Sequence, residues 1–242
     1  MPELELIIEK LSDAKNQDFE TNPEFRLWLT LLPSRSFPVS ILQNGIKIVI
    51  EPPRGIKNNM TRIYNTIATS QMDFLFYESC KKPQPWRKMF FGLAFFHTLI
   101  RERRKFGPLG WNVQYEFNES DFRISMRQLN VMLSKYEKIP YSALLYLTGE
   151  CNYGGRVTDL WDVRILSYLL SDFYNDDILY DHYRFSSLPQ YFAPADSLYI
   201  DDYIGYIDKL PPVDSTEVFG MHENALITLA RKETSEFFNA IL

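Results

Sequence analysis

Cysteine, histidine and surplus positive charge are all scarce in this chain. Its 242 residues include only two cysteines, Cys80 and Cys151, which lie far apart, and three histidines. A disulfide scaffold or a cysteine-rich zinc site is therefore not indicated. The formal net charge of -5 disfavours non-specific binding to nucleic acid or to an anionic membrane, because both require surplus lysine and arginine. We expect no metal site, no nucleic-acid partner and no membrane partner.

Long apolar runs and nucleotide-binding motifs are also missing. No run of about 18 apolar residues occurs that could span a membrane. The N-terminus lacks the basic and apolar segments of a signal peptide, so we expect no signal peptide. The scarcity of cysteine favours a reducing compartment. No GxxxxGK[ST] loop is present to hold phosphates, and no apolar strand ends in the acidic pair that would bind Mg²⁺. We therefore expect no catalytic residues and no nucleotide hydrolysis by this chain alone.

Hydrophobic residues are plentiful, at 45% of the chain with 15% aromatic, and their pattern changes near residue 53. Residues 1–53 predict a helix at 4–11, a strand at 25–31, a short helix at 39–43 and a strand at 46–50. Two strands are too few to form an independent sheet, so we expect them to need partners elsewhere. This part is predicted to be a small α/β remnant.

The rest of the chain is predicted to be mainly helical. The segment 85–105 is apolar nearly all round at MFFGLAFF, which places it centrally in a bundle, and its RERRK end is expected to be solvated. Asn118 is a candidate cap for the next helix, and Thr158 or Asp159 for a later one. Residues 174–197 are predicted to form a long aromatic loop. The aromatic residues of 183–206 are predicted to join helices or domains, with a ligand platform as the alternative. Further helices are predicted at 57–69, 140–147, 199–210 and near the C-terminus.

The segment GECNYGGR, at residues 149–156, contains the best candidate functional residue. We interpret GECNYGG as a glycine-rich loop, followed by Arg156 before a capped helix that contains Arg164. Arginines there can reach a phosphate or a neighbouring module. Alternatively, Arg156 caps carbonyl groups or pairs with Asp159 or Asp162. A Cys151–histidine nucleophile pair is a further alternative, although no oxyanion-stabilising feature accompanies it.

Several longer motifs carry a resemblance that covers nearly the whole chain. NPEFRLWLT, FPVSILQNG and EPPRG resemble the end of the large α/β part of the sixth AAA+ module in dynein heavy chains. RRKFGPLGWN, YEFNESDFRIS, YLTGECNYGGRVTD and FGMHENA continue the resemblance in the same order. FPVSILQNG and GECNYGGRVTD are similar to axonemal rather than cytoplasmic dyneins.

The resemblance implies a fold and a division of the chain. It implies that residues 1–53 are a remnant of an AAA+ large α/β subdomain, 54–197 a helical AAA+ lid domain, and 198–242 the start of the dynein C-terminal domain. It also places Thr30 at a sensor position, with Arg156 near the lid sensor and Arg164 as a second candidate. Metal ligands are not implied.

The resemblance further implies a structural and mechanical role in ATP-driven, minus-end-directed movement on microtubules. ATP and Mg²⁺ would be handled by other modules of the parent motor. Implied partners are the neighbouring AAA+ modules and C-terminal domain of the same heavy chain, with intermediate and light chains and microtubules reached through the whole motor. The implied location is the cytoskeleton of the cytoplasm and the ciliary axoneme. The alternative is a stand-alone helical adaptor protein derived from a dynein heavy-chain gene.

Overall fold

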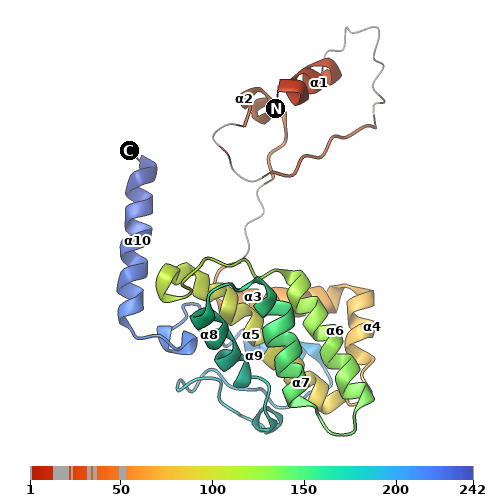
Figure 1. Cartoon of the computed structure of the whole chain (residues 1–242). Coiled ribbons are helices and arrows are strands. Elements are labelled where there is room, and N and C mark those ends of the chain that lie inside the picture. Colours follow the sequence, from red (N-terminus) through yellow and green to blue (C-terminus); the bar gives the residue numbers. More distant parts are fainter. Residues whose placement is uncertain are drawn as a thin grey trace. The chain divides into compact units, whose positions relative to one another are not determined.

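The computed structural model describes residues 2–12, 22, 24–31, 34, 37–48 and 53–241. It divides the chain into two units, Met1–Glu51 and Pro52–Leu242. Figure 1 shows the helices of both units in sequence colours. The division of the chain into lid and C-terminal domain near residue 197 stays a prediction.

The N-terminal unit contains two helices, α1 (Pro2–Ser12) and α2 (Val39–Asn44), as predicted. Ser40 of α2 donates a hydrogen bond to Glu5 of α1 at 2.5 Å. The two predicted strands are absent from the described residues: 25–31 and 46–48 form no β-ladder, and 49–50 lie outside them. A strand needs hydrogen-bonded neighbours, and two short apolar segments supply too few. Trp28 is accordingly 79% exposed, and the α/β character of this unit is not shown.

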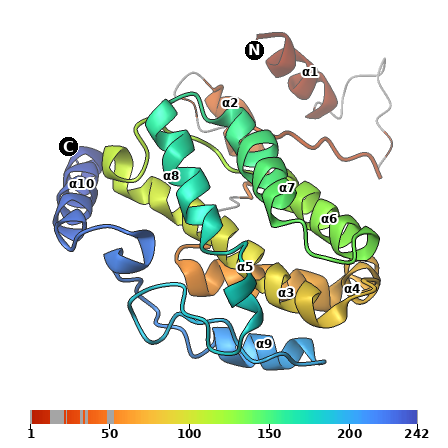
Figure 2. The ribbon, with the colours of Figure 1, turned by 60° about the horizontal axis from the view of Figure 1, so that its bottom comes forward.

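The C-terminal unit is an α-helical bundle, which confirms the mainly helical fold. The central helix, α5 (Pro83–Glu102), packs against α3, α6 and α8, and α9 packs on α3 (Figure 2). The remaining elements in chain order are α3 (Ile56–Thr69), α4 (Gln71–Glu78), η1 (Arg103–Leu109), α6 (Glu119–Lys135), α7 (Tyr141–Leu145), η2 (Tyr146–Tyr153), η3 (Gly154–Arg156), α8 (Leu160–Ser171), η4 (Asp176–Leu179), α9 (Ile200–Ile207), η5 (Thr216–Phe219) and α10 (Asn224–Ile241).

Helix α5 is buried on every side over most of its length. Each residue from Trp86 to Ile100 is buried. The sequence explains this position, because a helix that is apolar on all sides can bury its side chains only inside a bundle. The predicted central helix is therefore confirmed.

Two buried cations in the first turns of α5 hold the distant loop that follows η4. Arg87 donates to both carboxylate oxygens of Asp196, at 2.8 and 2.7 Å. Lys88, which is 1% exposed, donates to the Pro194 carbonyl at 2.8 Å and pairs with Asp181. Paired in this way, the charges avoid the large cost of burying an uncompensated ion.

Aromatic rings fill the space between that loop and α5. The Phe185 ring lies 5.0 Å from Phe95 and 5.1 Å from Phe173, measured between centroids, and stacks on Phe91 at 6.1 Å. These separations are typical of favourable aromatic pairs. The prediction that aromatic residues of this region join helices together is confirmed.

The predicted glycine-rich loop is helical instead. Residues 146–153 form the π-helix η2, and Gly154–Arg156 follow as a 3-10 turn. A Cβ at Gly154 would lie 2.3 Å from the Gly149 carbonyl oxygen, so this close approach requires glycine. The glycines therefore permit the close backbone approach between the π-helix and the 3-10 turn, and the segment is helical instead of a flexible loop.

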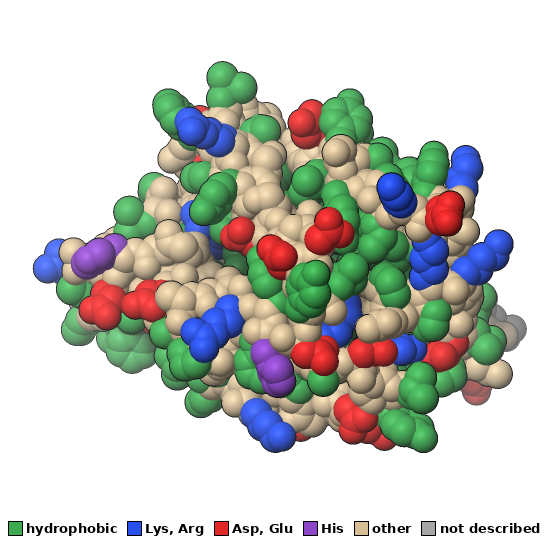
Figure 3. Space-filling model, turned by 90° about the horizontal axis from the view of Figure 1, so that it is seen from below, with side chains coloured by type: hydrophobic (Ala, Val, Ile, Leu, Met, Phe, Trp, Pro, Cys, Tyr) green, Lys and Arg blue, Asp and Glu red, His purple; other side chains and the backbone are tan. Residues whose placement is uncertain are grey.

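Charged groups are dispersed on the face of the molecule shown in Figure 3. Lysine and arginine side chains lie there among acidic and apolar ones. None of the helices described is both long and apolar enough to cross a membrane.

Candidate functional site

Arg156 ends the 3-10 turn η3 and pairs with a carboxylate on α6. Its Nε atom lies 3.3 Å from both carboxylate oxygens of Asp121. The Asp121 side chain is 7% exposed and that of Arg156 is 44% exposed, so the contact joins a buried anion to a half-exposed cation. Asp121 also accepts the backbone N–H of Asn118 at 2.9 Å in the capping box of α6. One carboxylate thus closes the first turn of α6 and holds the turn before α8.

Pairing of Arg156 with Asp159 or Asp162 was the wrong alternative, because both carboxylates have other partners. Asp159 caps α8 by accepting the N–H groups of Trp161 and Asp162 at 2.9 and 3.0 Å. It also accepts from Asn112 Nδ2 at 3.0 Å, and these hydrogen bonds, led by that of Asn112, lower its pKa. The prediction that Thr158 or Asp159 caps this helix is confirmed for Asp159.

Asp162 anchors the loop between η1 and α6. It is fully buried and accepts the backbone N–H groups of Asn112 and Val113 at 3.1 and 3.2 Å. The Tyr115 hydroxyl accepts the N–H of Asp159 at 3.1 Å. The start of α8 and the 110–118 loop are therefore held together by charge-assisted hydrogen bonds.

The other two sensor candidates have separate surroundings. Arg164 is exposed on α8, with its guanidinium carbon 6.0 Å from the centre of the Trp161 ring, a cation–π distance. Thr30 is exposed in the N-terminal unit. Arg156 is thus the sensor candidate that the structure places within a hydrogen-bonded network, and no sensor role is tested by these contacts.

The basic run 101–105 was expected to be a solvated helix end, which is wrong for Arg103. Arg103 is 5% exposed and donates through Nε and Nη2 to the Gly110 carbonyl, at 3.2 and 3.1 Å. Its Nη1 donates to the Phe219 carbonyl of η5, and its guanidinium lies 5.3 Å from the Trp111 ring centre. No local sequence signal marks this burial, because Phe219 is 116 residues away.

The structure gives no geometric support to the alternative that Cys151 and a histidine form a nucleophile pair. Cys151 is exposed, whereas His97 is buried and its Nδ1 hydrogen-bonds the Tyr153 hydroxyl at 2.9 Å. Across the described ranges, no group of three or more His, Cys, Asp or Glu side chains could hold a metal ion.

Comparison with known proteins identifies the family. Residues 86–225 match the model of the dynein heavy chain AAA lid domain, and residues 1–49 match that of the dynein heavy chain region D6 P-loop domain. The whole chain is 52% identical to mouse dynein axonemal heavy chain 3 and 51% identical to the human protein, covering 6% of each. It is 50% identical to mouse dynein axonemal heavy chain 12, of which it covers 8%.

The lid match spans more than half of the chain and covers the bundle from α5 to η5, while α3 and α4 precede the matched residues. The chain corresponds to only a small part of the length of the relatives it matches, so their activities do not follow from it alone. The chain belongs to the dynein heavy chain family and contains its AAA lid domain.

Proposed function

We propose that this chain is the lid region of an axonemal-type dynein heavy chain and acts as a mechanical part of the motor ring. The observation that carries the proposal is the match to the lid domain over a bundle with one continuous core around α5. The full heavy chain would use ATP and Mg²⁺ at other modules to drive minus-end-directed movement along microtubules. Partners would be the adjoining modules and C-terminal domain, and the site of action the ciliary axoneme.

The residues present do not fit a hydrolytic nucleotide site. The sequence has no P-loop to hold phosphates. The Nε of Arg156 is held by Asp121, so a phosphate would have to compete with that carboxylate. Arg156 remains a proposed sensor because 44% of its side chain is exposed, and its Nη atoms have no hydrogen-bond partner within the described part of the chain.

The mechanical role is tested by comparing two substitutions on one helix. In the full heavy chain, Leu166→Ala removes a fully buried side chain of α8, and Leu160→Ala removes one that is 85% exposed. The buried change is expected to destabilise the lid by about 2–5 kcal/mol. We expect Leu166→Ala to slow microtubule gliding while basal ATPase activity is kept, and Leu160→Ala to leave both unchanged. Unchanged gliding by a motor whose lid is measurably destabilised would contradict the proposal.

The absence of hydrolysis is tested on the purified chain. We expect neither ATP turnover nor co-sedimentation with microtubules. Turnover that persists after removal of contaminating ATPases would refute this part of the proposal.

The adaptor alternative predicts a different native polypeptide. An antibody to the residues 149–155 should detect a band of several hundred kilodaltons if the lid works within a motor. A band near 28.6 kDa, the mass of this chain, would favour the stand-alone protein instead.

A further inference from the structure

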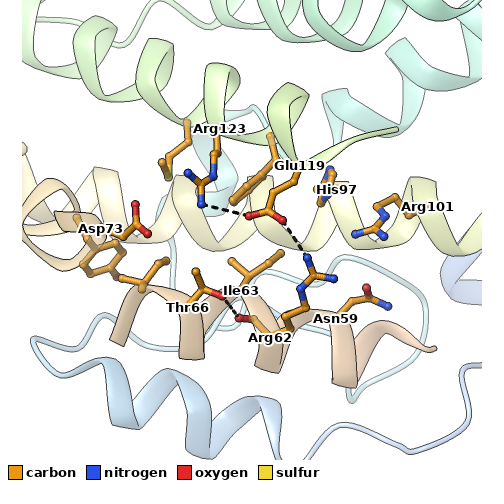
Figure 4. Close-up of a pocket in the computed structure, with 13 residues that line it drawn as sticks. Asn59, Arg62, Ile63, Thr66, Asp73, His97, Arg101, Glu119 and Arg123 are labelled. Carbon is orange, nitrogen blue, oxygen red and sulfur yellow. Dashed lines mark hydrogen bonds and ion pairs between the residues drawn. The ribbon is translucent and has the colours of Figure 1, made fainter. Parts of the chain in front are cut away.

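A small hollow that is open to solvent lies among α3, α4, α5 and α6. Figure 4 shows three arginines around it: Arg62 from α3, Arg101 from α5 and Arg123 from α6. The sequence alone does not reveal this cluster, because its members are brought together only by the packing of three helices.

Two of the three arginines share one carboxylate. Arg62 Nη2 lies 2.9 Å from Glu119 Oε2, and Arg123 Nη2 lies 3.4 Å from Glu119 Oε1. Arg101, which is half-buried, has neither a carboxylate within 4.0 Å nor a side-chain hydrogen bond among the residues described. Its neighbour Glu102 is engaged by Asn59 at 3.0 Å and by a lysine at 3.6 Å. Arg101 is therefore the cation of this cluster that lacks a close partner.

The electrostatics of the hollow favour an added negative charge. Burial lowers the pKa of Arg101 and the nearby positive charge of Arg62 lowers it further, while the negative charges of Glu102 and Glu119 partly oppose this shift. Burial, together with Arg101 and Arg62, lowers the pKa of His97 to about 3, so His97 is neutral near pH 7. Three guanidinium groups and two carboxylates, those of Glu119 and Asp73, line the hollow, which leaves an excess of one positive charge.

We propose that this hollow binds a small oxyanion, one phosphate or carboxylate group, between Arg62 and Arg101. A guanidinium presents a planar fork of donors that fits such groups, and an anion bound near both arginines would offset the repulsion between their positive charges. Figure 4 shows the head groups of Arg62 and Arg101 on the same side of the hollow, beside Asn59. The neighbouring walls at Ile63 and Phe122 are apolar and accommodate the uncharged part of such a ligand. The site is independent of the mechanical role proposed above.

The test follows the arginine Nε–Hε signals of the whole chain by NMR during titration with sodium phosphate or sodium acetate. Sodium chloride at matched ionic strength is the reference. We expect a saturable shift of the Arg101 signal with at least one of the two oxyanions, and the responsive anion identifies the preferred group. Removal of a charge-assisted contact should weaken binding by about tenfold or more.

Matched variants separate a site from general screening. Arg101→Gln should abolish saturation, whereas Arg104→Gln, which removes an exposed cation three residues away, should not alter it. Arg101→Lys keeps the charge without the fork and should bind more weakly than wild type. Circular dichroism checks the fold, and Arg62→Gln replaces Arg101→Gln should that variant not fold. Absence of saturation with both anions, or equal effects of Arg101→Gln and Arg104→Gln, would overturn the proposal.

Discussion

Gly92 lies in the middle of α5 where the chain after α8 crosses it. A Cβ built there would meet Ile178 Cδ1 at 2.4 Å and the backbone oxygen of Phe173 at 3.3 Å. Ile178 is fully buried, so its methyl group has little room to move away. We therefore expect Gly92→Ala to destabilise the bundle even though alanine is the better helix former.

The magnitude is the difference between two terms. Alanine gains about 1 kcal/mol of helix propensity over glycine. Overpacking a close-packed core costs about 1–3 kcal/mol. The net expectation for Gly92→Ala is a loss of about 1 kcal/mol. Gly205→Ala in α9, where a Cβ would meet no atom within 4 Å, should instead be stabilising by up to about 1 kcal/mol.

A second substitution isolates the clash. Ile178→Val removes the Cδ1 atom and alone should cost about 1 kcal/mol. In the double variant Gly92→Ala/Ile178→Val, the added methyl occupies space that Cδ1 has left. We expect it to be more stable than the sum of the single effects by about 1–2 kcal/mol, as contacting residues commonly show.

Urea unfolding of the wild type, the two single variants Gly92→Ala and Ile178→Val, and the double variant, followed by circular dichroism, measures this coupling. Additivity within about 0.5 kcal/mol, or a stabilising effect of Gly92→Ala alone, would refute the packing argument.

Two further predictions concern the buried side chains of Arg103 and His97. Arg103→Lys loses the forked hydrogen bonds to the Gly110 and Phe219 carbonyls and should destabilise the bundle by about 2–4 kcal/mol in urea unfolding; a loss below about 1 kcal/mol would contradict this. His97 stays neutral when folded and takes up a proton on unfolding below about pH 6.5, so its contribution to stability is lost as pH falls. His97→Gln should flatten the decline between pH 6.5 and 4.5 by about 1.4 kcal/mol per pH unit; an unchanged slope would disprove it.

Local patterns predicted the helical part of the fold because they depend on neighbours in sequence. The all-apolar run of α5, the Asn118 capping box of α6 and the Asp159 cap of α8 each involve residues within a few positions. The strand predictions were not confirmed, for the opposite reason. Residues 25–31 have a strand-like composition, but a ladder depends on partners that the pattern itself does not supply.

The candidate site shows the same limit. The sequence pattern indicates Arg156 as a candidate but predicts a partner only three to six residues away, at Asp159 or Asp162. The actual partner, Asp121, is 35 residues upstream and is buried at the start of α6. The oxyanion hollow could not be found at all, because each of its arginines alone has the pattern of an ordinary charged residue on a helix.

The long-range partners of the buried cations also explain why the bundle can act as one body. Arg87 contacts Asp196 109 residues away, Lys88 contacts Pro194 106 residues away, and Arg103 contacts Phe219 116 residues away. Breaking one such pair leaves a charge or carbonyl buried without compensation, which costs several kcal/mol. All three cations project from α5 or the turn that follows it, so late parts of the chain are fixed to the central helix. We therefore expect these late segments to move together with the central helix, as the mechanical role proposed above requires.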